Sequence, residues 1–551
     1  MQFDPILPPS RIEAMRRPGL WPDKLIIDYF DEAVARHPDR IAVSDVNSMT
    51  GRATTVSFRQ LQRMSRRMAL GLVALGVEHQ DVVSFQLPNW WHVAALYLAC
   101  TRIGAVINPL MPIFRHREVS FMLDYAQTKV VLVPRRFRGF DHPQMIRDIK
   151  GEVPHLRHML VVDGEDEETA IESVLLGRRW EDEMDGETIF RDRRPDPNDI
   201  NELIYTSGTT GQPKGVMHTS NTLMCNLEHV IEHIGITRED TVFMPSPLAH
   251  NTGFLYGMAI CLMLGIKSVL QDQWEPVQGA QRIQDEGVTF SMGSTPFLAD
   301  LTHTPAVEQY DTSTLRGFIV GGAPIPRVLV QAAVKKFGMR VISAWGMSEN
   351  GVVTATRQGD PEEKVFNTDG VALKDMEVRV VDDNDQPLPT GEEGRLQARG
   401  CFNFVGYLNK PDQYGMDADG WFETGDNATI DKDGYIRITG RSKDIIIRGA
   451  ENIPVVEIEQ LLYKHPAVQD CAIVGMPDER LGERGCCFMT LREGQSMTFR
   501  DMLEYLSAHH VAKNYWPERL ELVTELPRTP SGKIQKFKLR ELATELTPMS
   551  A

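Results

Sequence analysis

The chain has 551 residues, of which 42% are hydrophobic. This length exceeds what one ordinary hydrophobic core accommodates, so we expect two or more domains, one of them large. It carries 59 lysine and arginine residues against 76 aspartate and glutamate residues, a net charge of -17. This acidic balance argues against an electrostatic grip on nucleic acid or anionic lipid, because both need clustered positive charge.

The N-terminal region alternates helices and strands. Ser57 is placed to cap a helix over residues 57–77, whose apolar positions recur every three or four residues and which ends at Gly76. Buried strands are predicted at residues 82–85, 105–108, 130–133 and 160–162. Such alternation is typical of parallel sheets covered by helices and predicts an α/β fold.

From about residue 377 the pattern changes to two hairpins. Their turns are rich in Asp, Asn, Pro and Gly, and their strands are predicted at residues 378–381, 395–398, 428–430 and 435–439. These hairpins should form a small barrel-like part that completes a large domain, residues 1–442. Residues 443–551 then predict a separate, small and mobile α+β domain. Its expected elements are helices at 456–463 and 499–509 and strands at 471–474 and 486–491.

The seven cysteines are scattered and show no C-x-x-C spacing. This pattern is typical of reduced thiols in a cytosolic protein and argues against a disulfide framework or a zinc site. The first residues carry an acid and a proline where an export signal needs a basic start, so no export is expected. The longest strongly apolar stretch, around residues 254–266, is too short to span a bilayer. We therefore expect a cytoplasmic protein without a membrane span.

A loop rich in glycine and hydroxyl groups directly follows the apolar strand at residues 203–205. It reads Thr206-Ser207-Gly208-Thr209-Thr210-Gly211-Gln212-Pro213-Lys214-Gly215. Its glycines let backbone N–H groups approach a polyphosphate closely, its hydroxyl groups can donate hydrogen bonds to the phosphates, and its lysine adds a positive charge. It is not a Walker A loop, because Lys214 follows Gly211 by three residues and no hydroxyl residue comes after it. A flexible linker is the alternative interpretation of this composition.

The decapeptide resembles the phosphate-binding signature of the adenylate-forming superfamily, which includes acyl-CoA synthetases, firefly luciferase and the adenylation domains of peptide synthetases. The resemblance extends over nearly the whole chain. It implies an enzyme that joins a small-molecule carboxylic acid to coenzyme A through an acyl adenylate, using ATP and Mg²⁺. The implied ligands of the ATP phosphates are Thr206, Ser207, Gly208, Thr209, Thr210, Gly211 and Lys214.

A second motif, Ala344-Trp345-Gly346-Met347-Ser348-Glu349, is preceded by Gly321-Gly322-Ala323-Pro324. The resemblance implies that Ser348 and Glu349 are catalytic and that Glu349 binds Mg²⁺, an ion that prefers oxygen ligands and usually takes one or two carboxylates beside phosphate and water. Ser348 replaces the more usual threonine and keeps the hydroxyl. The residues implied to wall the adenine are Gly322, Ala323, Pro324, Ala344, Trp345 and Gly346.

Two later motifs supply the remaining implied residues. Asp426, in the stretch from 419 to 426, is similar to the superfamily aspartate that accepts hydrogen bonds from the ribose hydroxyls, and Arg441 is similar to its basic partner. Lys533 stands in the position of the adenylation lysine. As the carboxylate attacks the α-phosphorus two anions meet, and an ammonium group offsets their repulsion.

The resemblance also implies that the small domain swings about a hinge at Lys443. One pose inserts Lys533, and the other presents Gly449, Ala450 and Glu451 to line the tunnel for the thiol of coenzyme A. Ala450 replaces a glycine found in many relatives.

One further motif has a rival interpretation. His229-Val230-Ile231-Glu232-His233 matches the H-x-x-E-H pattern of inverted zinc peptidases. A catalytic zinc site needs a further ligand and a water position. The segment instead predicts an amphipathic helix that follows the phosphate loop, with both histidines on its polar side.

The substrate is predicted from residues around the expected acyl pocket. Residues 245–254, where the superfamily places an aspartate for amino-acid substrates, contain no acid, so the substrate should carry no amine. The candidate pocket residues combine aromatic walls with polar tips, and they are His250, Asn251, Phe254, Phe297, Trp345 and Met347. They favour a compact ring or a medium-length chain. The chain most resembles bacterial ligases for alicyclic and short to medium acids, such as cyclohexanecarboxylate-CoA ligases. An adenylation enzyme that loads a carrier protein is the alternative, and the oligomeric state stays open.

Overall fold

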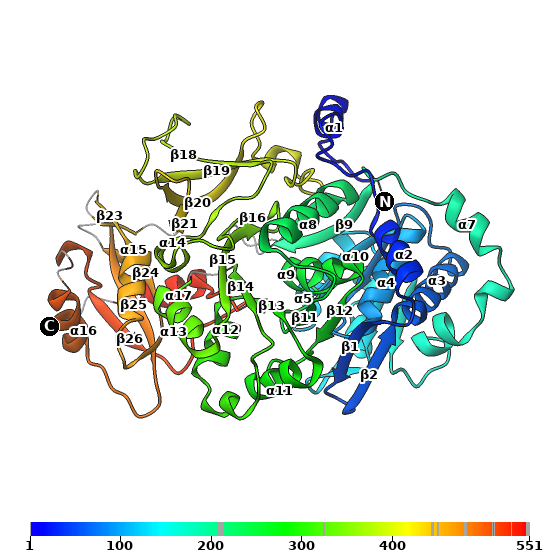
Figure 1. Cartoon of the computed structure of the whole chain (residues 1–551), viewed down its shortest axis with the longest axis horizontal. Helices are drawn as coiled ribbons and strands as arrows, with labels where there is room; N and C mark the ends of the chain where they lie inside the picture. The colour runs from blue at the N-terminus through cyan, green and yellow to red at the C-terminus, as the bar shows by residue number, and fades with distance from the viewer. Residues whose placement is uncertain are drawn as a thin grey trace.

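The computed structural model describes residues 2–206, 213–322, 325–441, 446–448, 451–478, 482–509, 511, 513–529 and 532–546. Strands and helices alternate through most of this length, and the C-terminal residues form a unit at one end of the molecule (Figure 1). The α/β fold class predicted from the sequence is confirmed, with a large N-terminal part, a barrel-like sheet and a C-terminal α+β part.

The largest sheet has nine strands, and its central strands are parallel. In spatial order they are β17 (Val371–Ala372), β16 (Gly351–Ala355), β15 (Arg340–Met347), β14 (Gly317–Gly321), β13 (Phe290–Gly293), β11 (Thr241–Met244), β12 (Lys267–Leu270), β1 (Ile41–Asn47) and β2 (Arg52–Ser57). Parallel strands bring their carboxyl ends to one edge of a sheet, where ligands of α/β proteins bind. The motifs at residues 321–322 and 344–349 both lie at this edge, because β14 and β15 are neighbours.

A six-stranded sheet carries the earlier motif. Its order is β10 (Lys214–Thr219), β9 (Ile200–Thr206), β4 (Val106–Pro109), β3 (Val82–Phe85), β5 (Val130–Pro134) and β8 (His158–Val162). All neighbours are parallel except β9 and β10, which pair as an antiparallel hairpin with Thr206 opposite Lys214. This hairpin fixes the two ends of the glycine-rich loop.

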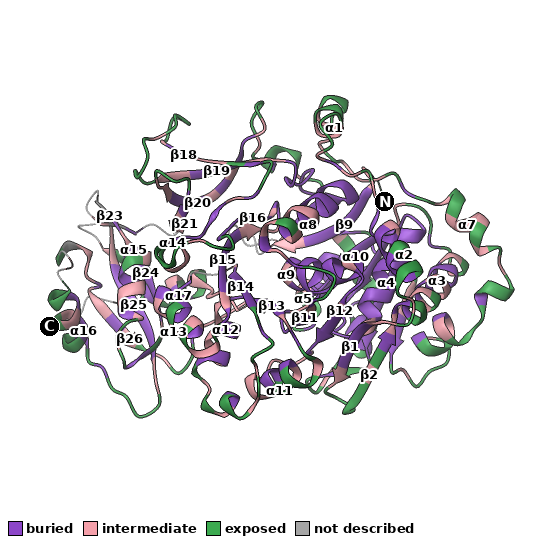
Figure 2. Cartoon of the chain, in the orientation of Figure 1, coloured by how far each residue is buried: buried purple, intermediate pink, exposed green. Residues whose placement is uncertain are grey.

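Helices cover both sheets, and the buried residues concentrate around α4, α10 and the strands beside them (Figure 2). The predicted helix at 57–77 is α3, and the Ser57 hydroxyl accepts a hydrogen bond from the backbone N–H of Gln60 at its start, as the sequence predicts. The helices of this part are α1 (Pro9–Arg16), α2 (Ile26–Arg36), α3 (Phe58–Ala74), α4 (Trp91–Arg102), α5 (His116–Tyr125), α6 (His142–Asp148), α7 (Gly186–Asp192), α8 (Ser220–Ile234), α9 (Asn251–Gly253), α10 (Ile260–Leu264), α11 (Pro276–Glu286), α12 (Thr295–His303), α13 (Arg327–Phe337) and α14 (Glu362–Asn367).

Two smaller sheets follow, as the change to hairpins predicts. The first is wholly antiparallel and contains β18 (Met376–Val381), β19 (Gly394–Gly400), β20 (Phe422–Ile430) and β21 (Ile436–Arg441). The second contains β23 (Glu451–Ile453), β22 (Ile446–Arg448), β25 (Gly482–Leu491), β24 (Val468–Asp478) and β26 (Arg519–Leu522). Helices α15 (Val455–Leu462), α16 (Phe499–Ala508) and α17 (Lys536–Ala543) accompany it, and its hydrophobic clusters contain only residues from 446 onward.

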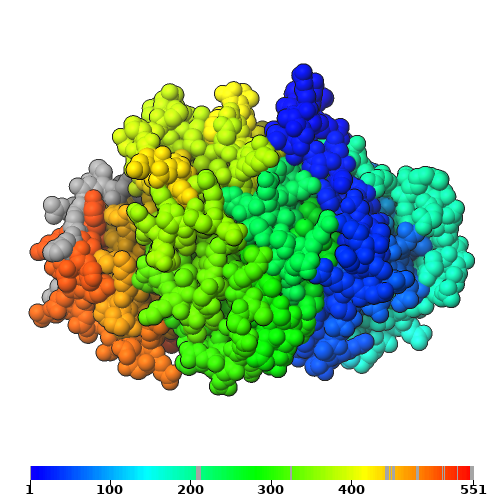
Figure 3. All heavy atoms as spheres, in the orientation of Figure 1, coloured from blue at the N-terminus to red at the C-terminus, as the bar shows by residue number. Residues whose placement is uncertain are grey.

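The N-terminal residues bind a segment that lies about 400 positions later in the chain. The Arg11 guanidinium donates to the backbone carbonyl of Phe404 and to the Tyr414 hydroxyl. The Ile6 backbone N–H donates to the Val405 carbonyl, and the Trp21 indole donates to the Cys401 carbonyl. In the space-filling view the N-terminal residues run along the outside of the large part, to the right of its centre, and the C-terminal unit lies at the left end (Figure 3). Within the described residues, no helix is long and apolar enough to cross a bilayer.

Candidate active site

The ends of the predicted phosphate loop are placed, whereas its middle is not. Ser207, Gly208, Thr209, Thr210 and Gly211 lie outside the described residues. At the described end, the Lys214 ammonium lies 4.4 Å from the centre of the Tyr407 ring, which is within range of a cation–π contact. The neighbouring backbone is tied to the same segment, because the Leu408 N–H donates to the Gly215 carbonyl at 2.8 Å.

Tyr407 joins this loop to Glu349. Its hydroxyl donates to Glu349 Oε1 at 2.7 Å, and Glu349 is only 5% exposed. The backbone of Glu349 is held as well, since its carbonyl accepts from the Phe404 N–H at 2.7 Å. Burial and the adjacent Glu349 carboxylate raise the pKa of the Tyr407 hydroxyl, so this hydroxyl stays protonated and remains a donor. Thr206, Lys214, Tyr407 and Glu349 therefore form one cluster at the sheet edges.

His218, on β10, fixes the backbone beside Glu349. Its Nε2 lies 2.7 Å from the Ser348 carbonyl, and since a carbonyl only accepts, Nε2 carries the proton. The ring is buried, and this burial lowers its pKa to about 4. The uncharged imidazole therefore connects the strand after the phosphate loop to the second motif at neutral pH.

We expect this histidine to make stability depend on pH. The unfolded chain binds a proton at a histidine below about pH 6.5, whereas His218 in the native state does so only near pH 4. The contribution of His218 to the free energy of unfolding should therefore be fully present above about pH 6.5. It should fall on acidification, by about 2 kcal/mol at pH 5. His218→Gln should flatten the decline of the unfolding midpoint between pH 7 and pH 5, measured by thermal denaturation. The exposed His155→Gln is the control, and an unchanged slope in His218→Gln would contradict the assignment.

The predicted adenosine residues come together from two sheets. The Trp345 indole N–H donates to Asp426 Oδ2 at 2.8 Å, and both residues are buried. Asp426 lies opposite Arg441 in the register of β20 and β21, although the side chain of Arg441 lies outside the description. Ala344 and Gly346 flank Trp345 on β15, and Gly322 directly follows the neighbouring strand β14. Ala323 and Pro324 lie outside the described residues.

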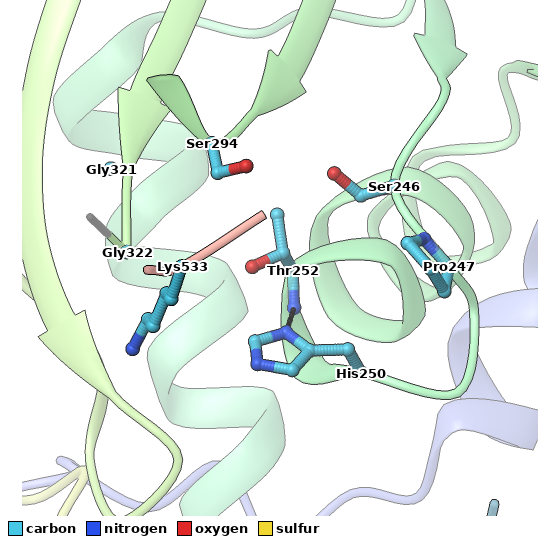
Figure 4. A pocket seen from close by; sticks show the side chains of 8 residues that line it. All are labelled: Ser246, Pro247, His250, Thr252, Ser294, Gly321, Gly322 and Lys533. Atoms are coloured by element: carbon cyan, nitrogen blue, oxygen red, sulfur yellow. Dashed lines mark hydrogen bonds between the residues drawn. The ribbon is translucent and has the colours of Figure 1, made fainter. Parts of the chain in front are cut away.

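Lys533, from the C-terminal unit, lies at a small cavity whose other walls belong to the large part of the chain. Ser246, Pro247, His250, Thr252, Ser294, Gly321, Gly322 and Lys533 line it (Figure 4). The backbone N–H of Lys533 donates to Thr529 Oγ1 at 3.0 Å. Gly532 permits the approach, because a Cβ there would lie only 2.8 Å from Ser294 Oγ, whereas a Cβ on Gly322 would make an ordinary contact with Lys533 Cε at 3.8 Å. The C-terminal unit thus delivers one ammonium group to the sheet edge.

His250 faces this ammonium across the cavity (Figure 4). Its Nδ1 accepts a hydrogen bond from the Thr252 N–H at 3.2 Å, so the ring orientation is set by its own helix start. Burial, and then the charge of Lys533, lower the His250 pKa to about 4. A neutral imidazole beside an ammonium group provides a polar rim that adds no second positive charge.

The other predicted pocket residues lie apart from the cavity. Phe254 is fully buried and packs edge-on against Tyr97, with ring centres 4.7 Å apart. Phe297 packs against Trp274 at 5.2 Å. Asn251 is buried with its Oδ1 unpartnered, and Met347 is half-buried at the end of β15. The cavity holds only about 10 Å³, the room of one water molecule, so the cavity itself is too small for an acyl group.

The predicted hinge and thiol-tunnel residues are mostly not placed. Lys443, Gly449 and Ala450 lie outside the described residues, and Glu451 begins β23 without a described side chain. In contrast, the structure identifies Tyr407, His218 and Ser294 as site residues that the sequence analysis missed. Tyr407 follows Gly406, whose φ of 127° is unusual for other residues, but a lone glycine-tyrosine pair carries no chemical signal.

Comparisons with known proteins agree with this geometry. The family model for AMP-binding enzymes matches residues 30–408, and that for the AMP-binding enzyme C-terminal domain matches residues 457–533. The medium-chain fatty-acid–CoA ligase of Escherichia coli (strain K12) is 35% identical over 535 residues, covering 97% of this chain and 93% of that protein. The 2,3-dihydroxybenzoate-AMP ligase of Bacillus subtilis (strain 168) is 29% identical over 544 residues, covering 98% and 97%.

A solved structure shares the whole architecture. The anthranilate CoA ligase AuaEII, in complex with anthranoyl-AMP, superposes with a TM-score of 0.83 over 95% of this chain and 98% of that chain. Because the two sequences are 24% identical, this likeness concerns the fold.

Proposed function

Because the chain belongs to the AMP-binding enzymes and is an AMP-forming acid–CoA ligase, we propose that its substrate is a medium-chain or alicyclic carboxylic acid, cyclohexanecarboxylate among them. The enzyme uses ATP to form an acyl adenylate, and the thiol of coenzyme A then displaces AMP. The 35% identity to a medium-chain fatty-acid–CoA ligase supports this substrate class, and the position of Lys533 at the edge of the nine-stranded sheet, beside Gly322 and His250, supports the adenylation step. We include a cytoplasmic location in the proposal, and the absence of disulfides among the seven described cysteines supports it.

The residues around Glu349 fit a magnesium ion. The carboxylate is buried and accepts a hydrogen bond from Tyr407, and a carboxylate is the kind of oxygen ligand that Mg²⁺ takes beside phosphate and water. Tyr407 occupies one oxygen and orients the group. Glu349 would hold Mg²⁺ there, and the ion would supply positive charge that neutralises the ATP phosphates. Lys214 and the loop that follows Thr206 would hold the same phosphates.

In the first step, the remaining residues position the reactants. Trp345 and Asp426 hold the adenosine, with Arg441 and the segment from Gly322 to Pro324 beside it. Lys533 places its ammonium where the carboxylate oxygen approaches the α-phosphorus, offsets the repulsion between the two anions and stabilises the developing charge. Ser348 contributes a hydroxyl at the phosphate side.

In the second step, the C-terminal unit changes its pose. We propose a domain boundary between residues 442 and 443, with Lys443 as the hinge. This position is supported by the end of β21 at Arg441 and the start of β22 at Ile446. Rotation would withdraw Lys533 and bring Gly449, Ala450 and Glu451 to the acyl adenylate, where they would line the path of the thiol.

The substrate class is tested by pyrophosphate release with MgATP and coenzyme A over a panel of acids. We expect hexanoate, octanoate and cyclohexanecarboxylate to exceed palmitate and benzoate in kcat/KM by about tenfold or more, because one methylene in an apolar pocket contributes about 1–3 kcal/mol. Amino acids should give no turnover, since residues 245–254 offer no acid to pair with an ammonium. Preference for palmitate would contradict the substrate assignment.

Loading of a carrier protein is the second candidate, because the chain is also similar over its length to an enzyme described as an AMP ligase. The two functions differ in their acceptor. Multiple turnovers with free coenzyme A support the ligase. A single burst of pyrophosphate without further turnover on coenzyme A would favour a carrier protein.

A further inference from the structure

The two histidines of the H-x-x-E-H motif face different partners. On α8, His233 donates from Nε2 to the Ala355 carbonyl at 3.0 Å. His229 instead places Nε2 3.0 Å from the Asp375 carboxylate. The motif therefore does not form a peptidase-like pair, and the Nδ1 of His229 faces another set of side chains.

That set consists of two cysteines from distant parts of the chain. Cys225 precedes His229 by one helical turn on α8, and Cys401 directly follows β19. The Cys225 and Cys401 sulfurs and a ring nitrogen of His229 lie within 4.8 Å of one another. Both cysteines are fully buried, whereas the His229 side chain is 11% exposed. Three potential ligands thus converge just below the surface.

The spacing between Cys225 and His229 is close to that of two ligands around a tetrahedral zinc ion. Bonds of about 2.3 Å to sulfur and 2.0 Å to nitrogen at the tetrahedral angle put the two ligand atoms about 3.5 Å apart. The distance between Cys225 Sγ and His229 Nδ1 is 3.7 Å. Without a metal, Nδ1 lies 2.7 Å from the Cys225 carbonyl. Metal binding would break this contact, release the Nδ1 proton to water and turn the nitrogen lone pair from the carbonyl towards the ion.

The second nitrogen of His229 is also arranged as in metal sites. Ligating histidines commonly donate their other N–H to a carboxylate, which fixes the ring and makes the ligating nitrogen more basic. Asp375 provides this carboxylate, and its backbone carbonyl lies 3.8 Å from Cys401 Sγ. The Phe402 ring packs edge-on against the imidazole, with ring centres 5.1 Å apart. The imidazole is therefore held through Nε2, with Nδ1 on the side of the Cys225 carbonyl and sulfur.

We propose that Cys225, His229 and Cys401 bind a thiophilic cation of the Zn²⁺ type. Thiolate and imidazole ligands select Zn²⁺ over Mg²⁺ or Ca²⁺, which prefer oxygen. Each thiol would release its proton to water on binding. The protein supplies three ligands, and the partly exposed side at His229 leaves the fourth position to water.

The site would join two segments that hold the catalytic cluster. Helix α8 directly follows β10, which contains Lys214 and His218. The segment after Cys401 contains Phe404 and Tyr407, which bind the backbone and the carboxylate of Glu349. A bound ion would therefore stabilise the frame of the active site without contacting any reactant.

The test uses the full chain, freed of metal by a chelator under reducing conditions and then titrated with Zn²⁺ or Co²⁺. We expect one ion per chain, a sulfur-to-cobalt charge-transfer absorption and a higher unfolding midpoint with Zn²⁺. Cys225→Ala, Cys401→Ala and His229→Gln should each weaken binding by tenfold or more, in line with the loss of a ligand. Cys100→Ala, which removes another buried thiol, is the matched control and should bind as the unaltered chain does.

Two results would overturn the proposal. Cobalt binding without the sulfur absorption would assign the ion to surface histidines. Undiminished affinity in both Cys401→Ala and His229→Gln would place the ion elsewhere; the milder His229→Gln change keeps this test valid if a cysteine variant folds poorly. None of these readouts uses the ligase reaction, so failure here and failure of the proposed function are distinguishable.

Discussion

Lys533→Ala should lower acid-dependent exchange between ATP and pyrophosphate by about 10²–10³-fold, the usual loss when one group that stabilises transition-state charge is removed. Transfer of the acyl group from a preformed acyl adenylate to coenzyme A should stay within about twofold of the unaltered enzyme, because Lys533 serves only the first step. The physical reason is its position: the ammonium lies at the cavity beside Gly322 and His250, whereas we propose that the thiol step uses another pose of the C-terminal unit.

Lys538→Ala is the matched control for this prediction. Lys538 lies on α17, a few residues further along the same unit, and is exposed to solvent. Its replacement removes one positive charge without touching the cavity, so both half-reactions should proceed normally. Equal loss of both half-reactions in Lys533→Ala would show that the lysine supports the fold of the unit, and an unchanged exchange rate would contradict its assigned role.

Glu349→Gln should have a loss of similar size, about 10²–10³-fold in the exchange reaction, with a higher Mg²⁺ concentration needed for half-maximal rate. The change keeps the shape of the side chain but removes the charge that Mg²⁺ would need. Tyr407→Phe is expected to cost about tenfold, because a hydrogen bond to a charged group contributes about 1.5 kcal/mol or more. The phenyl ring still faces Lys214, so only the bond to Glu349 is lost.

The double variant distinguishes positioning from an independent role. If Tyr407 acts by orienting Glu349, then Tyr407→Phe should add little to Glu349→Gln, since the two residues share one interaction. Glu392→Gln, at an exposed position, controls for loss of a negative charge. Full additivity of the two effects would contradict the positioning role of Tyr407, and an unchanged Mg²⁺ requirement in Glu349→Gln would contradict the role of Glu349 as a magnesium ligand.

The elements of this fold were predictable where local pattern and long-range packing agree. The predicted helix at 57–77 became α3 because its capping serine and apolar spacing both favour a helix against the sheet. The hairpin at 378–398 has the expected pairing, with Val378 opposite Ala398. Strand ends shifted by a few residues, as at β24, which extends from Val468 to Asp478 because it pairs along its length with β25.

The candidate site was predictable only through motifs, and its contacts were not. No spacing in the chain indicates that Tyr407 meets Glu349, since 58 positions separate them. The approach of Lys533 to Ser294 and Gly322 depends on how two folded units dock. The cysteines show the same limit: their lack of local spacing argued against a metal site, yet the fold places Cys225 and Cys401 around one histidine. The local sequence around each residue contains no information on such long-range tertiary contacts.

The binding of the N-terminal residues to the segment at 401–414 constrains the order of events during synthesis. A ribosome delivers the chain from its N-terminus, and early domains generally fold first. Here Trp21, Ile6 and Arg11 find their partners only after Cys401, Val405 and Tyr414, respectively, have left the ribosome. The large part of the protein therefore completes its fold late in translation, and the first residues stay accessible to chaperones and proteases until then.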